Sequence, residues 1–72
     1  MTGRPVKHSL TLKGHRTSVS LEGEFWEAFQ SLARARGLSL NELAAEVDAG
    51  RSGDVGLASA IRVWVLRALT AR

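Results

Sequence analysis

The sequence contains no cysteine, so disulfides and thiolate metal sites are excluded. It also lacks any stretch near the ~20 consecutive apolar residues that a membrane-spanning helix requires. The opening residues, MTGRPVKHS, carry charge and lack the apolar run of a signal peptide. Together these absences predict a cytoplasmic protein with no membrane association.

The chain is also short for a stable monomer. With 72 residues it forms one domain, and a domain of this size buries only about 60% of its unfolded surface. Such domains usually gain stability from disulfides, from a metal or from association with another chain. Since the sequence excludes disulfides and thiolate metal sites, we expect association, as a homodimer or a tetramer.

Acidic residues are missing from one end of the chain. The first 21 residues contain no Asp or Glu, whereas the acids are concentrated in residues 22–50, and the net charge is only +3. The basic residues of the acid-free segment are Arg4, Lys7, Lys13 and Arg16. A purely cationic segment suits an anionic partner such as a nucleic acid, but a solubilising tail has the same composition.

Residues 15–21 alternate in polarity with the period of a half-buried strand. The alternation predicts one inward set and one outward set. The inward set is Thr17, Val19 and Leu21, and the outward set is Arg16, Ser18 and Ser20. A single strand is not stable in water, so this strand needs a partner strand and a helical layer behind it.

A second alternating segment, residues 7–12, offers one such partner. With a two-residue loop at Lys13 and Gly14, Ser9 pairs with Ser18 and the apolar positions of both segments share one face. A primed turn would strain Lys13, so a type II turn or a bulged loop is an equal alternative. The pattern predicts a strand or hairpin over residues 7–21, after a flexible arm over residues 1–6.

The rest of the chain predicts three helices. Apolar residues at helical spacing predict a helix over residues 24–36, which ends before Gly37. Ser39 and Glu42 match the capping-box pattern and open a helix over residues 40–49. The third helix, over residues 57–70, is apolar on nearly every side of its middle, where only Arg62 is charged. A monomer this small can hardly bury such a helix, so we expect it to pack against a second chain.

This order of elements resembles the ribbon-helix-helix family of bacterial DNA-binding proteins, the Arc and MetJ type. The resemblance rests on a short strand, a helix that ends in glycine and a Ser-x-x-Glu start to the next helix, over residues 15–49. The sequence motifs KHSL, GHRTSVSLE and FW extend the resemblance to both ends of the chain. They are similar to those of a subfamily of this fold with no well-defined function. The resemblance implies a single domain over residues 1–72, mostly α with a short N-terminal β segment, that forms an obligate homodimer and has an additional C-terminal helix.

In that family, one strand from each subunit forms an antiparallel ribbon that enters the major groove of double-stranded DNA. The resemblance therefore implies that Arg16, Ser18 and Ser20 contact base edges. Arginine is chemically suited to a bidentate contact with guanine, and serine can pair with any base. The implied function is a sequence-directed DNA-binding protein that regulates transcription.

The resemblance also implies contacts to the DNA backbone. The amides at the start of the second helix, around Ser39, Leu40 and Asn41, would hold a phosphate, as helix N-termini do generally. The other cations of the N-terminal segment would add backbone contacts and salt dependence. These cations are Arg4, Lys7 and Lys13.

The extra segment at residues 7–12 leaves a second function open. A dimer of two hairpins would form a four-stranded sheet, whereas the major groove, about 12 Å wide, admits a helix or a two-stranded ribbon. The alternative is a protein-interaction or antitoxin-like assembly module that binds a protein partner and reads no groove.

The sequence has no pattern typical of catalysis or of a cofactor site. We therefore predict that the protein is not an enzyme and has no cofactor. His8 and His15 have no acidic or cysteine neighbours, so we interpret them as surface or capping residues and not as metal ligands. Trp26 and Trp64 lie in apolar stripes, which favours a place in the core or a dimer interface over stacking on bases.

Overall fold

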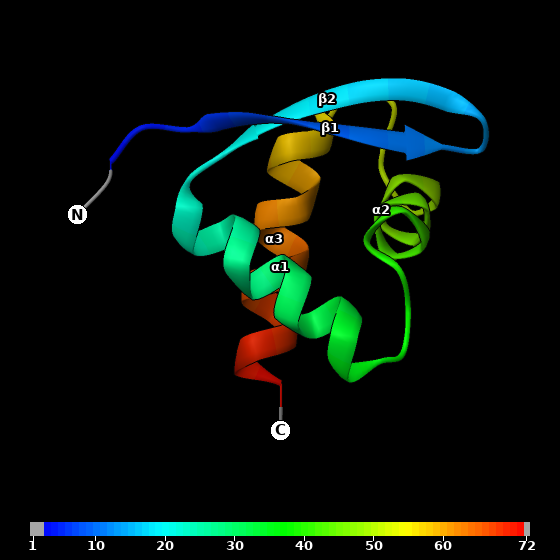
Figure 1. Cartoon of the computed structure of the whole chain (residues 1–72). Coiled ribbons are helices and arrows are strands. Elements are labelled where there is room, and N and C mark those ends of the chain that lie inside the picture. The colour runs from blue at the N-terminus through cyan, green and yellow to red at the C-terminus, as the bar shows by residue number, and fades with distance from the viewer. Residues whose placement is uncertain (1–2, 72) are drawn as a thin grey trace.

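The computed structural model describes residues 3–71 of the chain. Two strands are followed by three helices: β1 (Val6–Leu12), β2 (His15–Leu21), α1 (Gly23–Ala35), α2 (Leu40–Ala49) and α3 (Leu57–Thr70). The strands form one antiparallel hairpin that lies across the helices (Figure 1). The fold is thus mostly α, with a short N-terminal β segment and an additional C-terminal helix. Of the arm expected over residues 1–6, residues 1–2 lie outside the described residues, and Val6 already belongs to β1.

The hairpin has the register that the two alternating segments predict. Ser9 lies opposite Ser18, and β1 and β2 pair along their whole length. The backbone angle φ is positive at both turn residues, 50° at Lys13 and 84° at Gly14, so the turn is a primed one. The type II and bulged alternatives are therefore wrong. The sequence-based objection to a primed turn is still sound, because lysine adopts this conformation only at a cost in energy.

Of the two partners left open for strand 15–21, a second subunit or residues 7–12 of the same chain, the hairpin contains the second. The partner of β2 is β1 of the same chain. A two-residue turn places the two strands side by side, so pairing within the chain requires the closure of only a very short loop. The two-stranded ribbon formed by β1 and β2 is therefore complete in one copy of the molecule.

One face of the ribbon covers the hydrophobic core. Leu10, Leu12, Val19 and Leu21 on this inner face are all buried against the helices. Thr17 lies on this face as predicted, since it pairs with Leu10, but it is exposed and not buried. It lies towards the turn end of β2 and lines an open hollow there, together with Asp48 of α2, Arg51 and the first residue of α3, Leu57.

Two aromatic contacts connect α1 to the ribbon and to α3. The ring of His8, on the inner face of β1, stacks on Trp26 with the ring centroids 3.8 Å apart and the planes 2° from parallel. Trp64 of α3 meets Phe29 edge to face, with the centroids 5.9 Å apart. Both tryptophans are half-buried against the core cluster, which confirms their predicted place in apolar packing.

Local signals define the end of α1. Gly37 has φ of 70°, and its N–H donates to the carbonyl of Arg34 at 3.0 Å. The N–H of Leu38 donates to the carbonyl of Ala33 at 2.9 Å, which completes a Schellman motif. Glycine suits this position because a positive φ carries no steric cost without a Cβ atom. The chain then reverses into α2.

The third helix is buried on one side only. Ile61 and Val65 of α3 are almost completely buried against the other helices and the ribbon. Val63, Leu66 and Leu69, spaced three residues apart along the helix, are exposed, with exposed fractions of 46%, 59% and 62%. We call these three residues the outer face of α3. The surplus of apolar residues noted in the sequence therefore lies on this outer face.

Candidate nucleic-acid interface

The other face of the ribbon is polar and open to solvent. Its side chains come from three cross-strand pairs: Lys7 with Ser20, Ser9 with Ser18, and Thr11 with Arg16. All six residues are exposed. We call this surface the polar face of the ribbon. It combines one guanidinium and one ammonium group with four hydroxyl groups, a set that can donate to the base edges and the phosphates of DNA.

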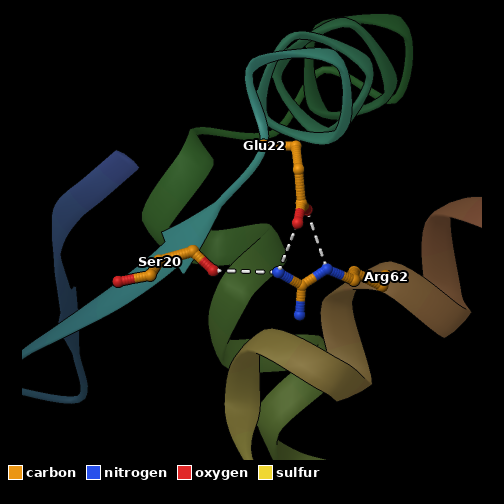
Figure 2. Close-up of polar contacts among 3 residues, drawn as sticks. All are labelled: Ser20, Glu22 and Arg62. Atoms are coloured by element: carbon orange, nitrogen blue, oxygen red, sulfur yellow. Dashed lines mark hydrogen bonds and ion pairs between the residues drawn. The ribbon is translucent and has the colours of Figure 1, made fainter. Parts of the chain in front are cut away.

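Each edge of the ribbon is bonded to a helix at one point. On the outer edge of β1, the backbone N–H of Thr11 donates to the side-chain oxygen of Asn41 in α2, at 3.0 Å. On the outer edge of β2, the backbone carbonyl of Ser20 accepts from the guanidinium of Arg62 in α3, at 3.3 Å (Figure 2). Such groups are otherwise free to pair with a further strand. These two bonds therefore restrict addition to both edges.

Arg62 is itself held in place by Glu22. Its Nε donates to Oε1 of Glu22 at 2.9 Å and its Nη2 donates to Oε2 at 3.1 Å, so the contact is bidentate. Figure 2 shows Arg62 lying between the Glu22 carboxylate and the Ser20 carbonyl. The hydrogen bonds from Arg62 lower the pKa of the Glu22 carboxyl below its ordinary value. Since Glu22 directly precedes α1, the Arg62 side chain joins α3 to the end of β2 and to the start of α1.

The start of α2 lies beside β1, as the Asn41 bond shows. Ser39 caps the helix: its hydroxyl accepts from the N–H of Glu42 at 3.1 Å, and its own N–H donates to the Glu42 carboxylate at 2.8 Å. This backbone hydrogen bond lowers the pKa of the Glu42 carboxyl. The Ser39 amide is therefore occupied by Glu42. Of the three amides predicted to hold a phosphate, those of Leu40 and Asn41 remain for this role.

The structure places some of the predicted site residues on the polar face of the ribbon and the others around it. Arg16, Ser18 and Ser20 lie together on the polar face of the ribbon, and the α2 start lies at its β1 edge. Lys13 is in the turn at one end of the ribbon, and Arg4 precedes β1 at the other end, where it is exposed. The acid-free N-terminal segment thus places cations along the whole length of the ribbon.

Two contacts were missed by reasoning from the sequence alone. The Asn41 contact to Thr11 joins residues 30 positions apart, and the Arg62 contact to Ser20 joins residues 42 positions apart. Arg62 did give a signal, since it is the single charge in the middle of an apolar helix. Asn41 gave none beyond its place near a helix start.

Residues 3–71 contain no group of three or more His, Cys, Asp or Glu residues arranged to hold a metal ion. Within the same part of the chain, every helix is too short or too polar to cross a membrane.

Comparison with protein families places the chain in a known domain family. A family model described as a ribbon-helix-helix domain matches residues 5–69 of the chain, which includes both strands and all three helices. Comparison with curated proteins and with solved structures gives no match.

Proposed function

Because this chain belongs to the ribbon-helix-helix family, we propose that it binds double-stranded DNA in a sequence-directed manner and regulates transcription. The observation on which this rests is the ribbon, two strands wide, with an exposed polar face and a buried inner face. A two-stranded ribbon is one of the elements that the major groove, about 12 Å wide, admits. A four-stranded sheet would require two of these hairpins to pair edge to edge, and the helix contacts at Thr11 and Ser20 restrict pairing at both edges.

Within this proposal, Arg16, Ser18 and Ser20 contact base edges. The Arg16 guanidinium is suited to the O6 and N7 atoms of guanine, and this contact gives most of the discrimination. The two serine hydroxyls are short and accept any base, so they add affinity and fit more than selectivity. The binding is therefore directed mainly by one arginine in β2.

The DNA backbone contacts lie around the polar face. Arg4, Lys7 and Lys13 neutralise phosphates and make the affinity depend on salt. At the β1 edge, backbone amides at the start of α2 bind one phosphate. This role was predicted for Ser39, Leu40 and Asn41. The occupied amide of Ser39 moves this role to the other two. These contacts fix the position of the ribbon without reading sequence.

We also propose that the protein is a homodimer whose subunits meet through the outer face of α3. Val63, Leu66 and Leu69 form an apolar strip on a chain of only 72 residues, and such strips usually mark an interface. A protein partner on this strip would instead give the alternative function, a protein-interaction or antitoxin-like assembly module that reads no groove. The polar face of the ribbon favours DNA binding over this alternative. The proposal is completed by a bacterial source, a cytoplasmic location and the absence of catalytic activity.

The experiment is fluorescence anisotropy with labelled duplex DNA across a series of salt concentrations. We expect binding at low salt that weakens linearly in log–log form as salt rises. The Arg16→Ala variant should lose about 1–3 kcal/mol of binding energy and keep its fold, since Arg16 is exposed. Absence of binding at low salt would refute the proposal.

A further inference from the structure

The two strands of the ribbon are similar in sequence. Residues 7–12 read Lys-His-Ser-Leu-Thr-Leu, and residues 16–21 read Arg-Thr-Ser-Val-Ser-Leu. With an offset of nine positions, each residue matches a residue of the same chemical kind, except for His8 and Thr17. A cation, a serine and a second hydroxyl alternate with two aliphatic residues in both segments. The similarity therefore includes both faces of the strand.

The pairing register turns this similarity into symmetry. Antiparallel strands are related by a two-fold axis perpendicular to the sheet, and the axis through the Ser9–Ser18 pair exchanges each residue with the one nine positions away. It therefore exchanges Lys7 with Arg16 and Thr11 with Ser20. On the inner face it exchanges Leu10 with Val19 and Leu12 with Leu21, which are all buried.

We propose that β1 is a second reading strand, so that one chain presents a two-fold symmetric reading surface in which Lys7 does on one side what Arg16 does on the other. This inference rests on the proposed DNA binding and changes the role of Lys7, from a backbone contact to a contact with a base edge. Lysine, like arginine, donates to the O6 and N7 atoms of guanine. The six side chains of the polar face then form two equivalent sets of three.

The geometry defines the DNA that this surface fits. Lys7 and Arg16 lie at diagonal positions, four residues apart along the ribbon, which is about 13 Å at the usual rise of a strand. This distance is about four steps of 3.4 Å along DNA. The partner is therefore a short inverted repeat in the major groove, with guanines on opposite strands about four base pairs apart, read by the ribbon of a single chain.

The edge contacts keep this surface two strands wide. Thr11 and Ser20, at symmetric positions on the two edges, are both bonded to helices, through Asn41 and Arg62 respectively. The two-fold axis exchanges these positions, so each edge has its bond at the equivalent place. A strand added to either edge would have to displace one of these bonds, and a wider sheet would not enter the groove.

The test compares three variants that each remove one exposed cation: Lys7→Ala, Arg16→Ala and, as the control, Arg34→Ala in the last turn of α1. The probe is a duplex selected by the parent chain from a random library, measured by anisotropy. We expect Lys7→Ala and Arg16→Ala each to weaken binding about 5- to 150-fold beyond the control. Each should also relax the preference for one base pair, at positions related by the inverted repeat.

The outcomes separate the two proposals. If Arg16→Ala weakens binding and Lys7→Ala behaves like Arg34→Ala, the second reading strand is refuted and the proposed function stands. If Lys7→Ala weakens binding equally to every duplex, Lys7 contacts only phosphates and this inference is again refuted. If the parent chain does not bind DNA, both proposals are refuted.

A second experiment needs no DNA. Because the chain has no cysteine, the double variant Ser9→Cys/Ser18→Cys places two thiols at the centre of the ribbon and nowhere else. Thr11 directs its N–H away from β2, so its pair and the Ser9–Ser18 pair are of the type without mutual hydrogen bonds, in which the Cα atoms lie about 4.5 Å apart. This separation permits a disulfide. Oxidation should give a cross-linked monomer on a non-reducing gel, whereas a covalent dimer would overturn the single-chain ribbon.

Discussion

The side chain of Asn41 at the start of α2 accepts the backbone N–H of Thr11 on the edge of β1, at 3.0 Å. This bond closes one edge of the ribbon and fixes the start of α2 beside it. We predict that Asn41→Ala exposes the Thr11 amide and accelerates its hydrogen exchange. The Asn41→Asp variant is the matched control, because it keeps an oxygen acceptor at the same place and should retain the protection. Equal exchange rates in the parent and in Asn41→Ala would show that the bond does not protect the edge.

At Lys13 in the turn, we predict that one substitution raises the stability of the fold and weakens DNA binding. Asparagine before glycine is a favoured pair for a primed turn, whereas lysine adopts a positive φ at a cost. Lys13→Asn should therefore raise the free energy of unfolding by about 1 kcal/mol. The same change removes one phosphate contact, so the slope of log K against log salt should become shallower by about 1. Urea denaturation and a salt series measure the two effects, and an unchanged slope would remove Lys13 from the interface.

The ion pair between Glu22 and Arg62 predicts a pH dependence of stability. Since Arg62 lowers the pKa of the folded carboxyl below its unfolded value, the stabilisation is fully present above the unfolded pKa. It is lost as the pH falls through the lowered, folded pKa. The Glu22→Gln variant should melt at a lower temperature than the parent at pH 7, and the difference should shrink towards zero on acidification. A difference in Tm that stays constant down to pH 2 would contradict this account.

The outer face of α3 predicts the effect of one charge on oligomeric state. Leu66 is 59% exposed in the chain, so Leu66→Glu leaves the core intact while it places a carboxylate at the centre of the proposed dimer contact. Sedimentation should show a dimer for the parent and a monomer for this variant. Ser31→Glu, at an exposed position on α1, is the control and should remain a dimer. If Leu66→Glu has the same mass as the parent, the dimer contact lies elsewhere.

Much of the fold could be predicted from local patterns. Two alternating segments around Lys13 and Gly14 were sufficient to define the strand register, because a shift by one residue would place one strand's apolar set on the polar face. The Ser39–Glu42 capping box and the glycine after α1 are likewise local signals, and both are present in the structure. Each of these features depends on residues close together in the sequence.

The remaining features depend on contacts between distant residues, which a local pattern does not encode. The exposure of Thr17 depends on where the end of α2 and the start of α3 lie relative to the hairpin, and the bonds of Asn41 and Arg62 depend on how the helices meet the ribbon. The identity of the partner of β2 was a choice between two chemically equivalent pairings. Family resemblance favoured a second subunit, whereas the short turn at Lys13 and Gly14 favours the same chain.

The central claim is that the polar face of the ribbon binds DNA, and a titration of the isotope-labelled chain with a short duplex at low salt, followed by amide chemical shifts, tests it most directly. The largest shifts should occur at Lys7, Ser9 and Thr11 of β1 and at Arg16, Ser18 and Ser20 of β2. Amides around the outer face of α3 should change little. No shifts at low salt, or shifts confined to Val63, Leu66 and Leu69, would contradict the claim.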